Sequence, residues 1–153
     1  RMLDCGELIQ VVRGVYAVHP ESLNVNKIAT QLYYPSYISF ESALAKYGII
    51  NQGPIGLTLA TSRHSKLLSI AGVECNYSKL KPSLFFGFDL IDNTYTASPE
   101  KAVLDELYLI SMGKRKTGTS EWSLDDLDRE KLQEFAKAYP ASIQHRLAEM
   151  GLV

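Results

Sequence analysis

The fold class is set by residues 49–97, where short strand-like runs replace the longer helical patterns found on either side. Apolar and β-branched residues recur there in brief runs that are separated by Gly53-Pro54, Ala71-Gly72, Lys81-Pro82 and Asp92-Asn93. Runs this short, bounded by turn-forming residues, are typical of strands. We expect short antiparallel strands, about four or five in all, at residues 57–61, 67–71, 73–77, 84–90 and 94–97.

Helices are predicted on both sides of this stretch. The clearest one follows Ser98, a natural N-cap, with Pro99 at the first helical position and Glu100 in the first turn. Gly113 ends it. Other helix starts are predicted at Asn24 or Asn26, at Ser36 or Ser39, at Asp125 or Asp128, and after Pro140. The sequence therefore predicts an α+β fold, with a short antiparallel sheet packed against helices and a helical tail.

A β-hairpin with an arginine at its turn is predicted near the start of the chain. Residues 7–12 and 15–18 are β-branched-rich runs around Arg13-Gly14. Residues 1–5 fit the last turn of a helix that Gly6 caps. An arginine at a hairpin tip can enter a minor groove or meet phosphate, and a solvated arginine is the alternative.

Charge, hydropathy and cysteine content exclude several classes of protein. The 153 residues carry a net charge of −1, which gives no overall reason to expect nucleic acid as a partner. There is no apolar run long enough to span a membrane and no signal-peptide pattern. We expect a reduced, cytoplasmic protein, with a Cys5–Cys75 disulfide as the alternative. From the start at Arg1 we expect a fragment or a processed product.

A search for catalytic and metal-binding patterns predicts neither an enzyme nor a cofactor. The three histidines share no ligand spacing, no serine stands in a nucleophile-elbow motif, and no phosphate-binding glycine loop is present. Asp125, Asp126 and Asp128 are expected to complement the positive end of a helix, with paired carboxylates that hold Mg²⁺ for catalysis as the alternative. Asp105, within an apolar helix, is expected to be a buried carboxylate held by a basic or backbone donor, with catalysis as the alternative.

The near-neutral total conceals an uneven distribution of charge. Residues 1–83 carry a net charge of +3, and residues 84–153 carry −4. Four basic residues lie close together in the sequence: Arg63, Lys66, Lys79 and Lys81. A basic sheet face with aromatic residues nearby can hold a nucleic-acid backbone, whereas lysines on a solvated sheet edge are the alternative.

Four stretches of the chain carry a resemblance to a known family. Residues 6–18 are similar to the wing hairpin of a winged helix-turn-helix regulator, and residues 37–50 to the helix that opens the domain following it. Residues 84–88 and 97–109, which include Ser98-Pro99-Glu100-Lys101 and Asp105, are similar to that domain's most recognisable stretches. In this order they resemble the AbiEi-type antitoxins of type IV abortive-infection toxin–antitoxin systems.

The resemblance implies a phage-defence antitoxin that counteracts a nucleotidyltransferase toxin and represses its own operon by binding operator DNA. Residues 1–20 would be the remnant of the winged helix, with Arg13 and Gly14 at the wing tip, and residues 21–153 the antitoxin domain. Arg63, Lys66, Lys79 and Lys81 match its basic strands. The recognition helix would precede residue 1. The alternative is a DNA-binding regulator whose second domain senses or dimerises, without a toxin.

Overall fold

The computed structural model describes residues 9–12, 15–17, 24–115 and 118–153. Strands β1 (Ile9–Val12) and β2 (Val15–Ala17) pair antiparallel, as predicted for the hairpin. Arg13 and Gly14, together with the helix end predicted at residues 1–5, lie outside the described residues. In the part of the chain that the structure describes, no helix is long and apolar enough to span a bilayer.

A six-stranded sheet forms the centre of the fold, in the order β5-β6-β4-β3-β8-β7. Its strands are β3 (Ser36–Ile38), β4 (Leu57–Thr61), β5 (Lys66–Ile70), β6 (Val73–Lys79), β7 (Phe88–Ile91) and β8 (Thr94–Ala97). The α+β class is therefore correct. The prediction of a purely antiparallel sheet is wrong, because β3 pairs parallel with β8, and β4 pairs parallel with β6.

The parallel pairs arise from two features that local sequence patterns do not report. The β5–β6 hairpin follows β4 in the chain, but its second strand, β6, is the one that lies next to β4, and β5 is at the edge of the sheet. Strands β4 and β6 therefore run in the same direction. In addition, β3 occupies residues that the sequence assigns to the start of a helix, and it joins strands far apart in the chain. Residues 84–90 are also not one strand, since a 3₁₀ turn at Pro82–Leu84 precedes β7.

Two helices pack on opposite faces of the sheet. Helix α1 (Val25–Leu32) begins at Asn24, whose side chain accepts a hydrogen bond from the Lys27 N–H at 3.1 Å. Helix α2 (Phe40–Lys46) begins at Ser39. Alternate residues of β4 face the two helices, since Leu59 belongs to the α1 core and Ala60 to the core that contains α2. All five residues of β4 are buried for this reason.

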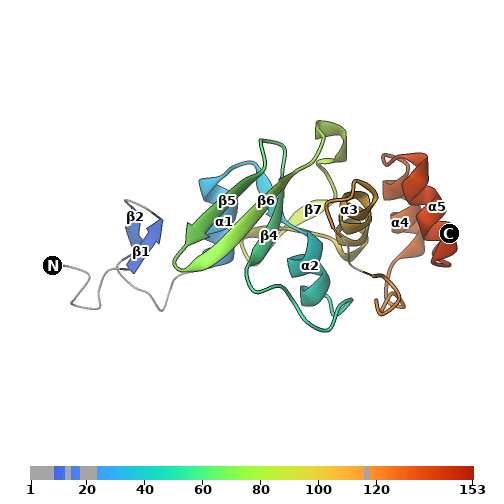
Figure 1. Cartoon of the computed structure of the whole chain (residues 1–153), viewed down its shortest axis with the longest axis horizontal. Helices are drawn as coiled ribbons and strands as arrows, with labels where there is room; N and C mark the ends of the chain where they lie inside the picture. The colour runs from blue at the N-terminus through green and yellow to red at the C-terminus, as the bar shows by residue number, and fades with distance from the viewer. Residues whose placement is uncertain (1–8, 13–14, 18–23, 116–117) are drawn as a thin grey trace.

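The remaining helices form a layer in which α3 is central. Helix α3 (Pro99–Ser111) lies between the sheet and the C-terminal helices α4 (Arg129–Ala136) and α5 (Ala141–Glu149) (Figure 1). Its residues from Glu100 to Leu109 are all buried, including the charged ones. The cap predicted at Ser98 is present, Asp128 and not Asp125 caps α4, and Pro140 separates α4 from α5 as expected.

Candidate functional site

A buried polar network centres on Lys101 and Asp105, one turn apart on α3. The two side chains form an ion pair and have no solvent exposure. Asp105 Oδ2 accepts hydrogen bonds from Tyr37 Oη at 2.8 Å and Ser39 Oγ at 2.7 Å, and its Oδ1 accepts one from Tyr139 Oη at 2.6 Å. Its carboxylate is therefore held by an ammonium group and three hydroxyls. Such pairing is what a buried charge requires.

The Lys101 ammonium group is equally well satisfied. Besides Asp105, it donates to the hydroxyl oxygens of Tyr37, at 3.2 Å, and Tyr139. It also lies 4.8 Å from the centre of the Phe86 ring. Burial lowers the pKa of Lys101, and the neighbouring carboxylate opposes that shift. Burial, reinforced by Asp105, raises the pKa of both Tyr37 and Tyr139 well above its ordinary value.

The other residues of the 98–105 stretch hold α3 in place. Ser98 Oγ accepts from the Lys101 N–H at 3.2 Å, and Pro99 occupies the first turn of the helix. Glu100 Oε2 accepts from the Asp128 N–H at 2.9 Å, which ties the start of α3 to the start of α4. The expectation of a buried, partnered Asp105 is met, and Asp105 has no access to a substrate in solution. Ser98, Pro99, Glu100, Lys101 and Asp105 therefore have structural roles here.

The acidic cluster before α4 also has a structural explanation. Asp128 Oδ1 accepts from the backbone N–H groups of Glu130 and Lys131, at 3.1 and 3.2 Å. Asp125 and Asp126 are exposed to solvent. Among the described residues, no group of three or more His, Cys, Asp and Glu side chains has the geometry to hold a metal ion.

The four basic residues predicted from the sequence meet at one end of the sheet. Arg63 lies in the loop between β4 and β5, Lys66 begins β5, Lys79 ends β6, and Lys81 follows it. The Lys79 N–H donates to Ser65 Oγ at 2.9 Å, which fixes the end of β6 against this loop. We call Arg63, Lys66, Lys79 and Lys81 the basic end; all four are exposed.

The ring of Tyr33 lies close to two of these cations. The Arg63 guanidinium carbon lies 4.2 Å from the centre of the Tyr33 ring, and Lys66 Nζ lies 5.3 Å from it. Arg63 also donates to the backbone oxygen of Tyr34 at 3.3 Å. None of the four forms an ion pair with another residue in the described ranges. This end of the sheet can therefore receive phosphate groups.

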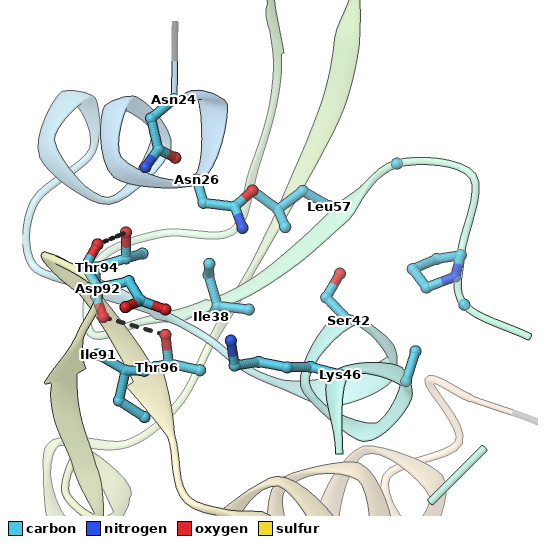
Figure 2. A pocket seen from close by; sticks show the side chains of 14 residues that line it. Asn24, Asn26, Ile38, Ser42, Lys46, Leu57, Ile91, Asp92, Thr94 and Thr96 are labelled. Atoms are coloured by element: carbon cyan, nitrogen blue, oxygen red, sulfur yellow. Dashed lines mark hydrogen bonds between the residues drawn. The ribbon is translucent and has the colours of Figure 1, made fainter. Parts of the chain in front are cut away.

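A cleft of about 490 Å³ opens where β3 ends and β4 and β8 begin. Figure 2 shows Lys46 reaching into it from α2, and Asp92 from the turn between β7 and β8. Thr94 and Thr96 line it as well; each hydroxyl donates to a backbone oxygen, at 3.4 and 3.1 Å. No histidine or cysteine is among the described residues that line the cleft. The polar lining of the cleft is suited to holding a small polar molecule.

A second buried acidic site was not found by sequence reasoning. Glu106 on α3 is fully buried, and its two carboxylate oxygens have no hydrogen-bond partner among the described residues. Burial, together with the nearby Glu41, raises the pKa of Glu106 from 4.5 to about 9. Arg115 donates to Glu41 Oε2 at 2.8 Å. Glu41 and Glu106 are far apart in the sequence, so no local pattern could have paired them.

Comparison of the chain with models of known protein families, with curated proteins and with solved structures finds no significant match.

Proposed function

We propose that this chain is the antitoxin and transcriptional autorepressor of a type IV toxin–antitoxin operon, and that it counteracts a nucleotidyltransferase toxin without catalysis. The observation that carries the proposal is where the stretches of family resemblance lie. Residues 37–50 supply Tyr37 and Ser39, residues 84–88 supply Phe86, and residues 97–109 supply Lys101 and Asp105. Stretches distant in sequence thus meet in one buried network.

The buried network gives a physical reason why these stretches would be similar in proteins that share the domain. A buried ion pair with several hydroxyl partners tolerates few substitutions, because removing one partner leaves an uncompensated charge. Residues of this kind are expected to recur wherever the same domain is built. In this proposal residues 21–153 form the antitoxin domain, and residues 1–20 belong to a winged helix with Arg13 and Gly14 at its wing tip.

Growth rescue tests the antitoxin function directly. The protein is co-expressed with the nucleotidyltransferase toxin that the proposal places in the same operon, and we expect restored growth. An Asp125→Asn variant is the matched control for catalysis by the exposed acidic cluster, and it should rescue as well as the parent. A well-expressed, folded protein that leaves the toxin fully active would contradict the antitoxin function.

The basic end favours a second candidate, a nucleic-acid-binding regulator that has no toxin. Four exposed cations at one end of a sheet supply backbone contacts that depend strongly on salt. Replacing all four with alanine should weaken nucleic-acid binding and flatten its salt dependence. The matched control removes the same charge elsewhere, at Lys46, Lys114, Lys131 and Lys137. Equal losses in both variants would show that net charge, and not this surface, determines binding. Genomic context separates the two candidate functions, because a toxin gene next to the coding sequence favours the antitoxin.

A further inference from the structure

A hollow of about 310 Å³ lies between α1 and the β7–β8 hairpin, beside the basic end. Two tyrosines line it, and both rings are accessible: Tyr34 is 61% exposed and Tyr95 is 36% exposed. Leu90, 58% exposed, lies opposite Tyr95 in the β7–β8 register. Large apolar side chains gathered around one hollow indicate a binding site more strongly than scattered ones do.

The same hollow presents polar groups suited to a flat, hydrogen-bonding ligand. Gln31 and Asn93 both line it, and their amide groups can each donate and accept. Neither side chain bonds to another residue in the part of the chain that is described. Asn93 is held at the tip of the β7–β8 turn, where it and Asp92 adopt positive φ angles of 63° and 52°. A nucleobase has both the π faces that stack on tyrosine and the edge that amides bind.

Tyr34 joins the hollow to the basic end. Its ring lines the hollow, and its backbone oxygen accepts the hydrogen bond from Arg63. Arg63 and Lys66 both lie close to the ring of Tyr33. The row of cations therefore starts next to the hollow, at Arg63, and extends toward Lys79. A polyanion lying along these cations would bring the groups it carries within reach of the two tyrosines.

We propose that the hollow takes one unpaired base of a single-stranded nucleic acid whose phosphates lie over Arg63 and Lys66. The inference rests on the second candidate function, a nucleic-acid-binding regulator, and it adds the class of nucleic acid. A duplex keeps its bases stacked inside, so it could contact the cations but would leave the tyrosines unused. A single strand uses both, because every base has a face that can stack on an aromatic ring.

Fluorescence anisotropy with labelled DNA and RNA strands of about 12 nucleotides, measured over a range of salt concentrations, tests this assignment. We expect Tyr34→Ala and Tyr95→Ala each to weaken single-strand binding by roughly 5- to 150-fold, the equivalent of about 1–3 kcal/mol per stacked base. The salt dependence should stay unchanged in both. Tyr34→Phe should retain the affinity, because it keeps the ring. Leu67→Ala, an exposed apolar residue on β5, is the control and should have no effect.

Two results would overturn the inference. One is a single-strand affinity that stays within about twofold of the parent in both tyrosine-to-alanine variants, given that each stacked base is worth 1–3 kcal/mol. The other is an equal loss in Leu67→Ala. Growth rescue distinguishes this failure from failure of the proposed function. Intact rescue without any single-strand binding overturns the inference alone, whereas failed rescue with tyrosine-dependent binding contradicts the antitoxin function alone.

Discussion

Removing the charge of Asp105 should destabilise the protein far more than removing any exposed carboxylate. In Asp105→Asn the Lys101 ammonium group stays buried and loses its only counter-charge among the described residues. Breaking a buried ion pair on one side costs about 3–5 kcal/mol. For a chain of this size that corresponds to a fall in Tm of roughly 6–20 °C, at about 2–4 °C for each kcal/mol.

Urea and thermal unfolding, followed by circular dichroism, measure the loss. The matched control is Glu134→Gln, which breaks the Lys137–Glu134 pair on the surface. Both of its side chains are about 70% exposed, so the control should change the free energy of unfolding by less than ~1 kcal/mol.

A double variant separates the uncompensated charge from the lost hydrogen bonds. Lys101→Met combined with Asp105→Asn removes both charges and keeps the shape of the site. We expect the double variant to be more stable than Asp105→Asn alone, with a coupling energy between the two substitutions of about 0.5–3 kcal/mol. An Asp105→Asn protein within about 1 kcal/mol of the parent, or a double variant no better than the single one, would refute the electrostatic explanation of this network.

Substitutions at three further positions test other parts of the fold. The folded protein keeps a proton on Glu106 that the unfolded chain releases, because folding raises this pKa from 4.5 to about 9. The free energy of unfolding should therefore fall as pH rises between these values, and Glu106→Gln should flatten that slope in urea titrations at several pH values. Gly87→Ala should destabilise by about 2 kcal/mol or more, since φ is +75° and a Cβ there would lie 2.9 Å from Lys101 Cδ; an unchanged urea midpoint would contradict this. Ser98→Ala should cost about 1 kcal/mol in the same assay by removing the cap of α3, while Ser98→Asn should preserve most of it.

The sequence was informative wherever structure depends on neighbouring residues. The cap at Ser98 was predicted, and Asn24 and Asp128 were each one of two predicted helix starts, because each places a side-chain oxygen near an N–H two or three residues ahead. Strand β3 was missed because it exists only through backbone pairing with β4 and β8, and both partners are remote in the chain. Parallel pairing was missed for the same reason.

The candidate sites follow the same division. The cations of the basic end could be picked out by their density in the sequence, but their contact with Tyr33 depends on how α1 packs on the sheet. The burial of Asp105 could be predicted from its apolar neighbours on the helix. Its hydroxyl partners could not, because Tyr37 and Tyr139 lie on either side of it in the chain, more than 30 residues away.

The C-terminal helices complete the core, and this affects when the domain can fold during synthesis. Tyr139 supplies one hydroxyl to the Lys101–Asp105 pair, and Leu152 is only 2% exposed. While residues 139–152 are still inside the ribosome, a nascent chain would therefore carry α3 with one side uncovered and its charges incompletely paired. Domains generally fold as units. We expect this domain to reach its native state only after residues 139–152 have left the ribosome, so a stop codon placed before Tyr139 should yield an unstable product that proteases remove.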